Sequence, residues 1–183
     1  EESAKIEYSE RAGWPRFWLV DPLDGTKEFV NRNGEFTVNI AFVDNGAPVL
    51  GVVYVPVTGV CYLAVRGQGA WKETGGCDRQ PIRVRTYRGG RATVVASRSH
   101  RGDAVDKFLA NLKAREGEYD TTSLGSSLKL CRVEEGAADV YPRLGPTSEW
   151  DTAAAQCVVE SAGGRVTDLD GQPLRYNKSN ILN

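Results

Sequence analysis

The sequence predicts one domain of the α/β or α+β class, built from layers of sheet and helix. Two observations support this class. Strand-like segments rich in branched and aromatic residues fill the first half of the chain, and helix-like segments are interleaved with short strands in the second half. The length of 183 residues suffices for one sizeable core. We therefore expect residues 1–183 to form a single layered domain rather than a β-sandwich.

The first strands are expected to form an antiparallel meander. Residues 17–20 (Phe-Trp-Leu-Val) are a short apolar run that stops at Asp21-Pro22, which is typical of a buried strand. The segments that follow are rich in branched and aromatic residues and are separated by turns that contain Gly, Asn or Pro. These predicted strands span residues 36–43, 49–55 and 60–65, with shorter ones at 82–84 and 92–96.

Three segments in the second half carry helical signals. Residues 103–114 place Val105, Leu109 and Leu112 on one face. Residues 126–135 and 151–162 form the other two predicted helices, and each is followed by a glycine, which is typical of a helix C-terminus. The interleaving of these helices with short strands completes the layered prediction.

The composition excludes several classes of protein. The net charge of −1 gives no general attraction for a nucleic acid polymer or an anionic lipid surface. The four cysteines form no C-x-x-C pair, so no zinc site is expected and free thiols in a reducing cytosol are indicated. No run of about 18 apolar residues and no signal peptide are present, so no transmembrane segment is expected. A cytoplasmic protein is favoured; attachment at the periphery of the inner membrane and the oligomeric state are left open.

The most informative segment is residues 21–26, Asp-Pro-Leu-Asp-Gly-Thr. Two carboxylates lie three residues apart at the end of an apolar strand, and Pro22 donates no hydrogen bond, which leaves the Leu23 carbonyl free to point the same way. Oxygen ligands of this kind are those that Mg²⁺ prefers. Gly25 permits a tight turn, and its amide and that of Thr26 can open a short helix that binds phosphate oxygens. The alternative interpretation is an ordinary Asx-type turn.

Asp151 is a candidate third carboxylate. It stands in Trp-Asp-Thr-Ala-Ala at the start of a predicted helix, where an aspartate is usually an N-cap. Beside the carboxylates of residues 21–26, it could instead complete the ligands of a second metal ion.

Four further residues are candidate phosphate or nucleotide contacts, and each has a simpler explanation. His100, the only histidine, follows a strand and could be structural. Ser126 and Lys129 lie where a helix begins, so Ser126 could be an ordinary cap. Arg143 could bind a phosphate through two parallel hydrogen bonds, or it could be a surface arginine.

Several motifs together resemble the inositol monophosphatase superfamily. W-L-V-D-P-L-D-G-T is similar to its first signature, and W-D-T-A-A followed by A-G-G is similar to its second. The segments K-E-F-V-N-R-N-G-E-F-T-V-N-I-A, S-R-S-H, S-S-L-K and Y-P-R-L-G-P-T resemble the bacterial branch of 3'(2'),5'-bisphosphate nucleotidases. The resemblance covers essentially the whole chain and implies a layered αβαβα sandwich of the inositol monophosphatase and fructose-1,6-bisphosphatase type.

The resemblance implies a site for two or three Mg²⁺ ions. Asp21 matches the carboxylate that bridges two ions, and the Leu23 carbonyl matches a ligand of the first. Asp24 and Asp151 match ligands of the second ion. Glu1 matches the glutamate of the family's acidic motif, whereas its neighbour Glu2 matches a residue that is not a usual ligand.

The resemblance also implies catalytic and substrate contacts. Asp21, Asp24 and Thr26 are the expected catalytic residues, with Thr26 helping to orient the attacking water. Lys129 and Arg143 could hold the 5'-phosphate that is not cleaved. The expected substrate-binding residues are Glu1, Leu23, Asp24, Gly25, Thr26, His100, Ser126, Lys129, Arg143 and Asp151.

The expected activity is hydrolysis of the 3'-phosphate of adenosine 3',5'-bisphosphate, with its sulfated form as a further candidate, by a metal-activated water. The alternatives are an inositol monophosphatase or fructose-bisphosphatase-like enzyme, and a non-catalytic module that binds metal or nucleotide. The chain contains no methionine and begins with Glu1. Since the family carries an N-terminal helical part and a last strand that are not recognised here, we expect a truncated phosphatase domain.

Overall fold

The computed structural model describes residues 6–76, 78–97 and 102–183 and contains two sheets. The larger sheet is an antiparallel meander of six strands in the order β1-β2-β3-β4-β5-β6. These strands span Arg16–Asp24, Thr37–Asp44, Ala47–Val55, Val60–Val65, Gly69–Thr74 and Asp78–Ile82. The smaller sheet pairs β7 (Ala92–Ser97) with β8 (Tyr119–Leu124) in parallel, and Val140 forms a further bridge to Val94.

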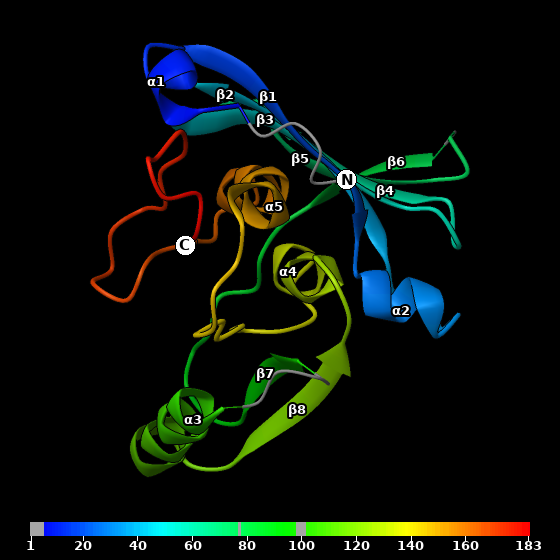
Figure 1. The fold of residues 1–183 in the computed structure, drawn as a ribbon. Helices are drawn as coiled ribbons and strands as arrows, with labels where there is room; N and C mark the ends of the chain where they lie inside the picture. Colours follow the sequence, from blue (N-terminus) through cyan, green and yellow to red (C-terminus); the bar gives the residue numbers. More distant parts are fainter. Residues whose placement is uncertain (1–5, 77, 98–101) are drawn as a thin grey trace.

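The helices and sheets stack in layers. Figure 1 shows α4 and α5 between the two sheets, and α3 on the other side of β7 and β8. The helices are α1 (Tyr8–Arg11), α2 (Thr26–Val30), α3 (Asp103–Glu116), α4 (Leu128–Glu134) and α5 (Glu149–Ser161). This arrangement confirms the predicted layered α/β class. No described helix is long and apolar enough to cross a membrane.

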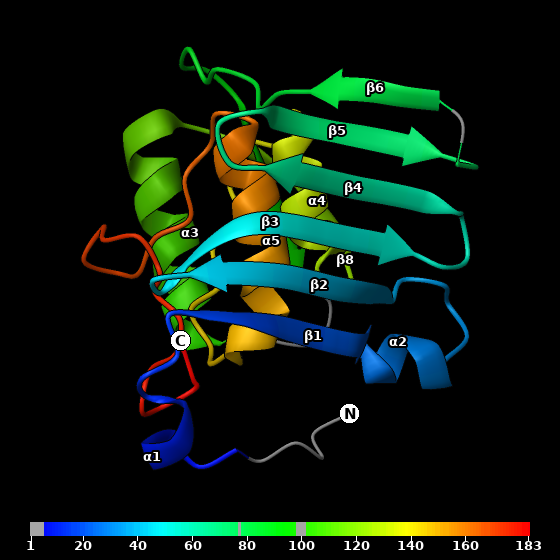
Figure 2. The same cartoon turned by 90° about the horizontal axis from the view of Figure 1, so that it is seen from above.

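The main core lies where α5 crosses the inner face of the larger sheet, as Figure 2 shows from above. The closest approach is between β3 and α5, because a Cβ atom added at Gly51 would lie 2.2 Å from the Ala154 carbonyl oxygen. Three consecutive alanines at 153–155 are almost fully buried in α5. Glycine in the strand and alanines in the helix therefore let the two backbones pack directly against each other.

The outer face of the larger sheet is apolar and accessible to solvent in the described part of the chain. Trp18 is 57% exposed and Val20 is 49% exposed. The buried strand expected at 17–20 is therefore wrong in one respect, because only alternate residues of β1 face the core.

The structure corrects several predicted boundaries. β5 and β8 were not expected, since their sequences, Gly-Ala-Trp-Lys-Glu-Thr and Tyr-Asp-Thr-Thr-Ser-Leu, contain few aliphatic residues. The strand expected at 82–84 is β6, and it lies earlier because residues 78–82 pair with β5. The helix expected at 151–162 begins two residues earlier, at Glu149, because Ser148 is its N-cap. The helix expected at 126–135 is shorter, at Leu128–Glu134.

Glu134 at the end of α4 is a fully buried carboxyl group. Its side chain is 0% exposed, and neither of its oxygens accepts a hydrogen bond from the described residues. The pKa of Glu134 is raised to about 8, chiefly by burial and also by the Glu135 charge, while the Cys131 thiol and the Lys72 charge oppose the rise. The folded chain therefore holds this proton more tightly than the unfolded chain.

We expect Glu134→Gln to remove a pH-dependent loss of stability. Below the ordinary pKa of 4.5, Glu134 is protonated in both the folded and the unfolded chain. As pH rises toward about 8, the unfolded chain releases this proton first, so the free energy of unfolding falls. Glutamine cannot ionise, so the free energy of unfolding of the variant should rise relative to that of the parent by on the order of 4 kcal/mol between pH 5 and pH 9.

Urea unfolding at both pH values measures this difference. Glu116→Gln is the matched control, since Glu116 lies at the exposed end of α3 and should show no comparable gain. Equal pH dependence of the parent and Glu134→Gln would show that Glu134 ionises normally in the folded chain.

Candidate active site

The two carboxylates of β1 reach the same face of the sheet because the strand contains a bulge. Residues three apart in a regular strand point to opposite faces. Here Asp21 pairs with Asn39 and Asp24 pairs with Thr37, so two residues of β1 lie opposite one residue of β2. The extra residue restores the alternation and directs both carboxylates inward. The strand thus continues through Asp24, and the expectation that it stops at Asp21-Pro22 is corrected.

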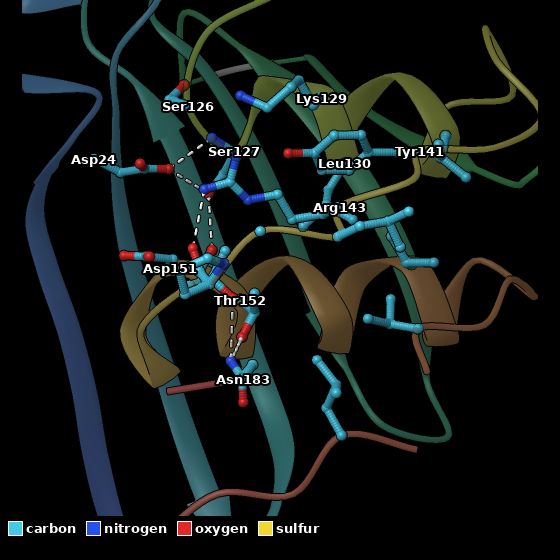
Figure 3. A pocket seen from close by; sticks show the side chains of 18 of the residues that line it. Asp24, Ser126, Ser127, Lys129, Leu130, Tyr141, Arg143, Asp151, Thr152 and Asn183 are labelled. Atoms are coloured by element: carbon cyan, nitrogen blue, oxygen red, sulfur yellow. Dashed lines mark hydrogen bonds between the residues drawn. The ribbon is translucent and has the colours of Figure 1, made fainter. Parts of the chain in front are cut away.

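Three carboxylates converge at this end of the sheet. Asp21, Asp24 and Asp151 each offer one oxygen, and these oxygens lie within 4.8 Å of one another. Asp21 is 3% exposed, and the other two are half-buried. Figure 3 shows Asp24 and Asp151 on the same side of the cavity, from β1 and the start of α5. The structure therefore brings together the three aspartates predicted to bind metal.

Asp151 is placed by the first turn of α5. It is the third residue of the helix, and the Ser148 amide donates a hydrogen bond to its Oδ2 at 2.8 Å. The N-cap alternative for Asp151 is wrong, because Ser148 takes that position. The pKa of Asp151 is raised to about 6, chiefly by burial and also by the nearby Asp24 carboxylate, while the Ser148 hydrogen bond opposes the rise. Desolvated carboxylates so close together form a site that a cation would stabilise.

The turn after β1 has features of both interpretations of residues 21–26. The Leu23 amide donates to Asp21 Oδ1 at 3.0 Å, as in an Asx-type turn. Gly25 is left-handed, with φ of 93°, and α2 begins at the next residue, Thr26. The short helix expected at this point is confirmed. Gly25 and Thr26 line the cavity beside Asp24.

Lys129 and Arg143 are two of the four described basic residues that line the same cavity, which has a volume of about 780 Å³; the other two are Lys27 and Arg165. Lys129 lies in α4 with only 7% of its surface exposed, and its Nζ lies 5.7 Å from the centre of the Tyr141 ring. Burial lowers the pKa of Lys129, against the opposing effect of the Asp24 carboxylate. Arg143 donates to the Pro146 carbonyl at 3.1 Å, and its buried Nε has no partner among the described residues. Ser126 and Lys129 reach the cavity beside Arg143 (Figure 3).

Most of the predicted site residues meet in this cavity. Its lining includes Asp24, Gly25, Thr26, Ser126, Lys129, Arg143 and Asp151. Asp21 joins them through the carboxylate cluster, and Leu23 lies in the bulge beside it. Glu1, Glu2 and His100 lie outside the described residues.

Three residues that the sequence did not indicate surround Asp24. They are the buried residues Thr37, Asn39 and Ser127. All their hydrogen bonds to Asp24 end on one carboxylate oxygen, Oδ2. The pairing of β1 with β2 and the position of α4 create these contacts. The only signal in the sequence is that Thr37 and Asn39 are polar residues at alternate positions of a largely apolar strand.

The donor set fits a hard divalent cation. Three carboxylates within 4.8 Å provide oxygen ligands, and no hydrogen bond from the described residues occupies Oδ1 of Asp24. Mg²⁺ is held in proteins by a few carboxylates together with water and substrate phosphate. No described histidine or cysteine joins the cluster, which disfavours zinc.

Comparisons with known proteins agree with this geometry. A model of the inositol monophosphatase family matches residues 1–183. The chain is 54% identical over 174 residues to the 3'(2'),5'-bisphosphate nucleotidase CysQ of Escherichia coli K12, which covers 94% of this chain and 68% of that protein. It is 35% identical over 194 residues to CysQ of Haemophilus influenzae, which covers 100% of this chain and 66% of that protein.

Solved structures show the same fold. The crystal structure of CysQ from Bacteroides thetaiotaomicron superposes with a TM-score of 0.91 at 45% identity, over 99% of this chain and 72% of that one. An inositol monophosphatase from Anabaena superposes with a TM-score of 0.73 at 29% identity, over 92% of this chain and 69% of that one. The layered arrangement of these proteins and the similarity of their sequences point to one common family.

Proposed function

The chain belongs to the inositol monophosphatase family, and on that premise we propose that it is a 3'(2'),5'-bisphosphate nucleotidase. The reaction is hydrolysis of the 3'-phosphate of adenosine 3',5'-bisphosphate, which yields adenosine 5'-phosphate and inorganic phosphate. A relative that carries this name is 54% identical, and the solved structure of a protein also called CysQ superposes with a TM-score of 0.91.

One observation carries the proposal: the acidic cluster and the cations of Lys129 and Arg143 share one cavity. A substrate with two phosphates needs one site where a phosphate is cleaved and another that binds the phosphate that is retained. The carboxylates of Asp21, Asp24 and Asp151 suit the cleaved phosphate through metal, and the cations of Lys129 and Arg143 suit the retained one. An inositol monophosphate has no second phosphate for Lys129 and Arg143 to bind.

We propose that Asp21, Asp24, Asp151 and the Leu23 carbonyl hold Mg²⁺, with two or three ions bound together with substrate. When bound, the metal supplies charge neutralisation and activation of a water molecule. Gly25 and Thr26 lie where their amides can donate to the oxygens of the cleaved phosphate. Thr26 also has a hydroxyl group that can orient the attacking water. Ser126 lines the same cavity, where it can contact the nucleotide.

The location proposed for the enzyme is the cytoplasm. The three described cysteines, Cys61, Cys131 and Cys157, are free thiols, which is typical of a reducing compartment.

A panel of phosphate esters tests the proposed function. Inorganic phosphate release is measured with Mg²⁺ from adenosine 3',5'-bisphosphate, adenosine 5'-phosphate, inositol 1-phosphate and fructose 1,6-bisphosphate. We expect release from the bisphosphorylated nucleotide at a kcat/KM at least about 100-fold above that for the other three. Preference for inositol phosphate or fructose bisphosphate would overturn the nucleotide assignment. The absence of release from all four, with Mg²⁺ bound, would indicate a binding module.

A further inference from the structure

Three buried residues converge on one oxygen of Asp24. The Ser127 hydroxyl lies 2.5 Å from Asp24 Oδ2, and the Ser127 amide lies 2.6 Å from the same atom. The Thr37 hydroxyl and the Asn39 amide nitrogen each lie 3.3 Å from it. These donors come from two elements, β2 and the start of α4, that are distant in sequence. Asp24 Oδ2 is therefore held from two sides.

The hydrogen bonds have a defined direction. Asn39 Nδ2 donates to Ser127 Oγ at 2.9 Å, which leaves the single Ser127 hydroxyl proton for another acceptor. That acceptor is Asp24 Oδ2 at 2.5 Å rather than the Asp151 carbonyl at 3.1 Å, because the carboxylate is charged and closer. Asn39 therefore donates to Ser127, and Ser127 donates in turn to Asp24.

This series of hydrogen bonds leaves the side-chain oxygen of Asn39 without a hydrogen bond from the described part of the chain. Asn39 is 1% exposed, and its Oδ1 accepts no hydrogen bond from the described residues. A reversed amide would place this oxygen against Ser127 and the Asp24 carboxylate, where it would be repelled. The observed orientation leaves one buried acceptor unsatisfied, which native structures usually avoid away from functional sites.

The three side chains expose almost no surface, and only Ser127 is part of the cavity lining. Thr37 is 0% exposed and Ser127 is 4% exposed. All four hydrogen bonds leave the other carboxylate oxygen, Oδ1, without a donor among the described residues. A carboxylate held in this way can present only Oδ1 to a cation.

From this geometry we infer that Ser127, with Asn39 and Thr37, is a positioning residue that sets the metal affinity of the site by fixing the orientation of Asp24. The inference rests on the metal site of the proposed function. Mg²⁺ requires near-ideal ligand geometry, so a carboxylate free to rotate binds it less well. Residues that orient metal ligands typically change metal affinity by about 10- to 100-fold when they are replaced.

Metal affinity without substrate is the direct test. Mn²⁺ binding is measured by titration calorimetry and by electron paramagnetic resonance for the parent, Ser127→Ala and Thr37→Val. We expect each variant to raise the Mn²⁺ Kd, by about tenfold for Ser127→Ala and less for the longer bond of Thr37. Ser127→Thr keeps the hydroxyl group and should stay within about threefold of the parent. Ser123→Ala in β8 is the matched control and should change nothing, because no described partner bonds its hydroxyl.

Turnover as a function of Mg²⁺ concentration separates positioning from a direct catalytic role. If Ser127 acts through metal affinity, saturating Mg²⁺ restores kcat in Ser127→Ala to within about threefold of the parent. An unchanged Mn²⁺ Kd in both Ser127→Ala and Thr37→Val would overturn the inference. A kcat that saturating Mg²⁺ does not restore would also overturn it. Failure of the parent chain to bind Mn²⁺ would instead overturn the proposed metal site.

Discussion

Replacing Asp21 by asparagine is expected to abolish phosphate release while the chain stays folded. Asp21 is 3% exposed and lies within the carboxylate cluster, so it is the least accessible of the three proposed metal ligands. An amide oxygen binds Mg²⁺ more weakly than a carboxylate and carries no charge to offset that of the cation. We expect kcat/KM to fall by at least about 1000-fold, because metal chemistry supplies most of the proposed rate enhancement.

The fold should survive this change for a specific reason. The Leu23 amide donates to Asp21 Oδ1 at 3.0 Å, and the asparagine oxygen can accept the same hydrogen bond. The change also removes one of three mutually repelling carboxylates, so the melting temperature without metal should not fall. The rise in melting temperature that Mg²⁺ produces in the parent should be lost, since that rise depends on binding to the folded state.

Asp44→Asn is the matched control for Asp21→Asn. Asp44 lies at the far end of β2 and pairs with Arg16 at 3.3 Å on the surface, so the same change of charge occurs outside the site. This variant should keep phosphate release and metal-dependent stabilisation within about twofold of the parent. If Asp21→Asn retained activity within about tenfold, Asp21 could not be a metal ligand and the proposed mechanism would fail.

The carboxylate cluster could be predicted from the sequence, but the reason for its geometry could not. Asp21 and Asp24 were identifiable from their spacing after an apolar strand. A regular strand would separate them onto opposite faces, and only the pairing of Asp21 with Asn39 and of Asp24 with Thr37 reveals the bulge. Strand register depends on contacts between segments, and residue types in one segment do not determine it.

The hydrogen-bond partners of Asp24 show the same limit more sharply. Ser127 is separated from Asp24 by 103 residues, and of the two serines in the helix-start motif only Ser126 was a predicted contact. The structure gives the two serines different positions. Both serines line the cavity, but Ser126 is left-handed, with φ of 43°, whereas Ser127 is only 4% exposed and bonds to the Asp24 carboxylate. One residue thus faces the proposed substrate and the next holds the proposed metal ligand.

Short strands were the least predictable elements. β8 lacks the run of branched apolar residues that identified β2 and β3, and the parallel pairing with β7 stabilises it instead. The layer that contains β7 and β8 matters for function because α4 packs between the two sheets and carries Lys129. The position of the Lys129 side chain therefore depends on strands that the sequence only partly predicts.

Arg143→Ala is expected to remove the preference for a second phosphate while leaving the cleavage step intact. The Arg143 Nε is buried without a described partner, and a guanidinium with a free donor is suited to bind phosphate through parallel hydrogen bonds. For adenosine 3',5'-bisphosphate we expect kcat/KM to fall by about 100-fold. For adenosine 3'-phosphate, which has no 5'-phosphate, the fall should stay within about threefold.

Two further variants make this comparison specific. Arg143→Lys keeps the charge but not the planar pair of donors, so an intermediate loss of about tenfold is expected for the bisphosphate. Arg165→Ala removes a second arginine, which is exposed, from the lining of the same cavity. It should lower kcat/KM only weakly, and equally for both substrates. If Arg143→Ala lowered kcat/KM for both substrates by the same factor, Arg143 would act on the cleaved phosphate instead. The two cations would then belong to the cleavage site, and the cavity would give no reason to prefer a bisphosphate over a monophosphate.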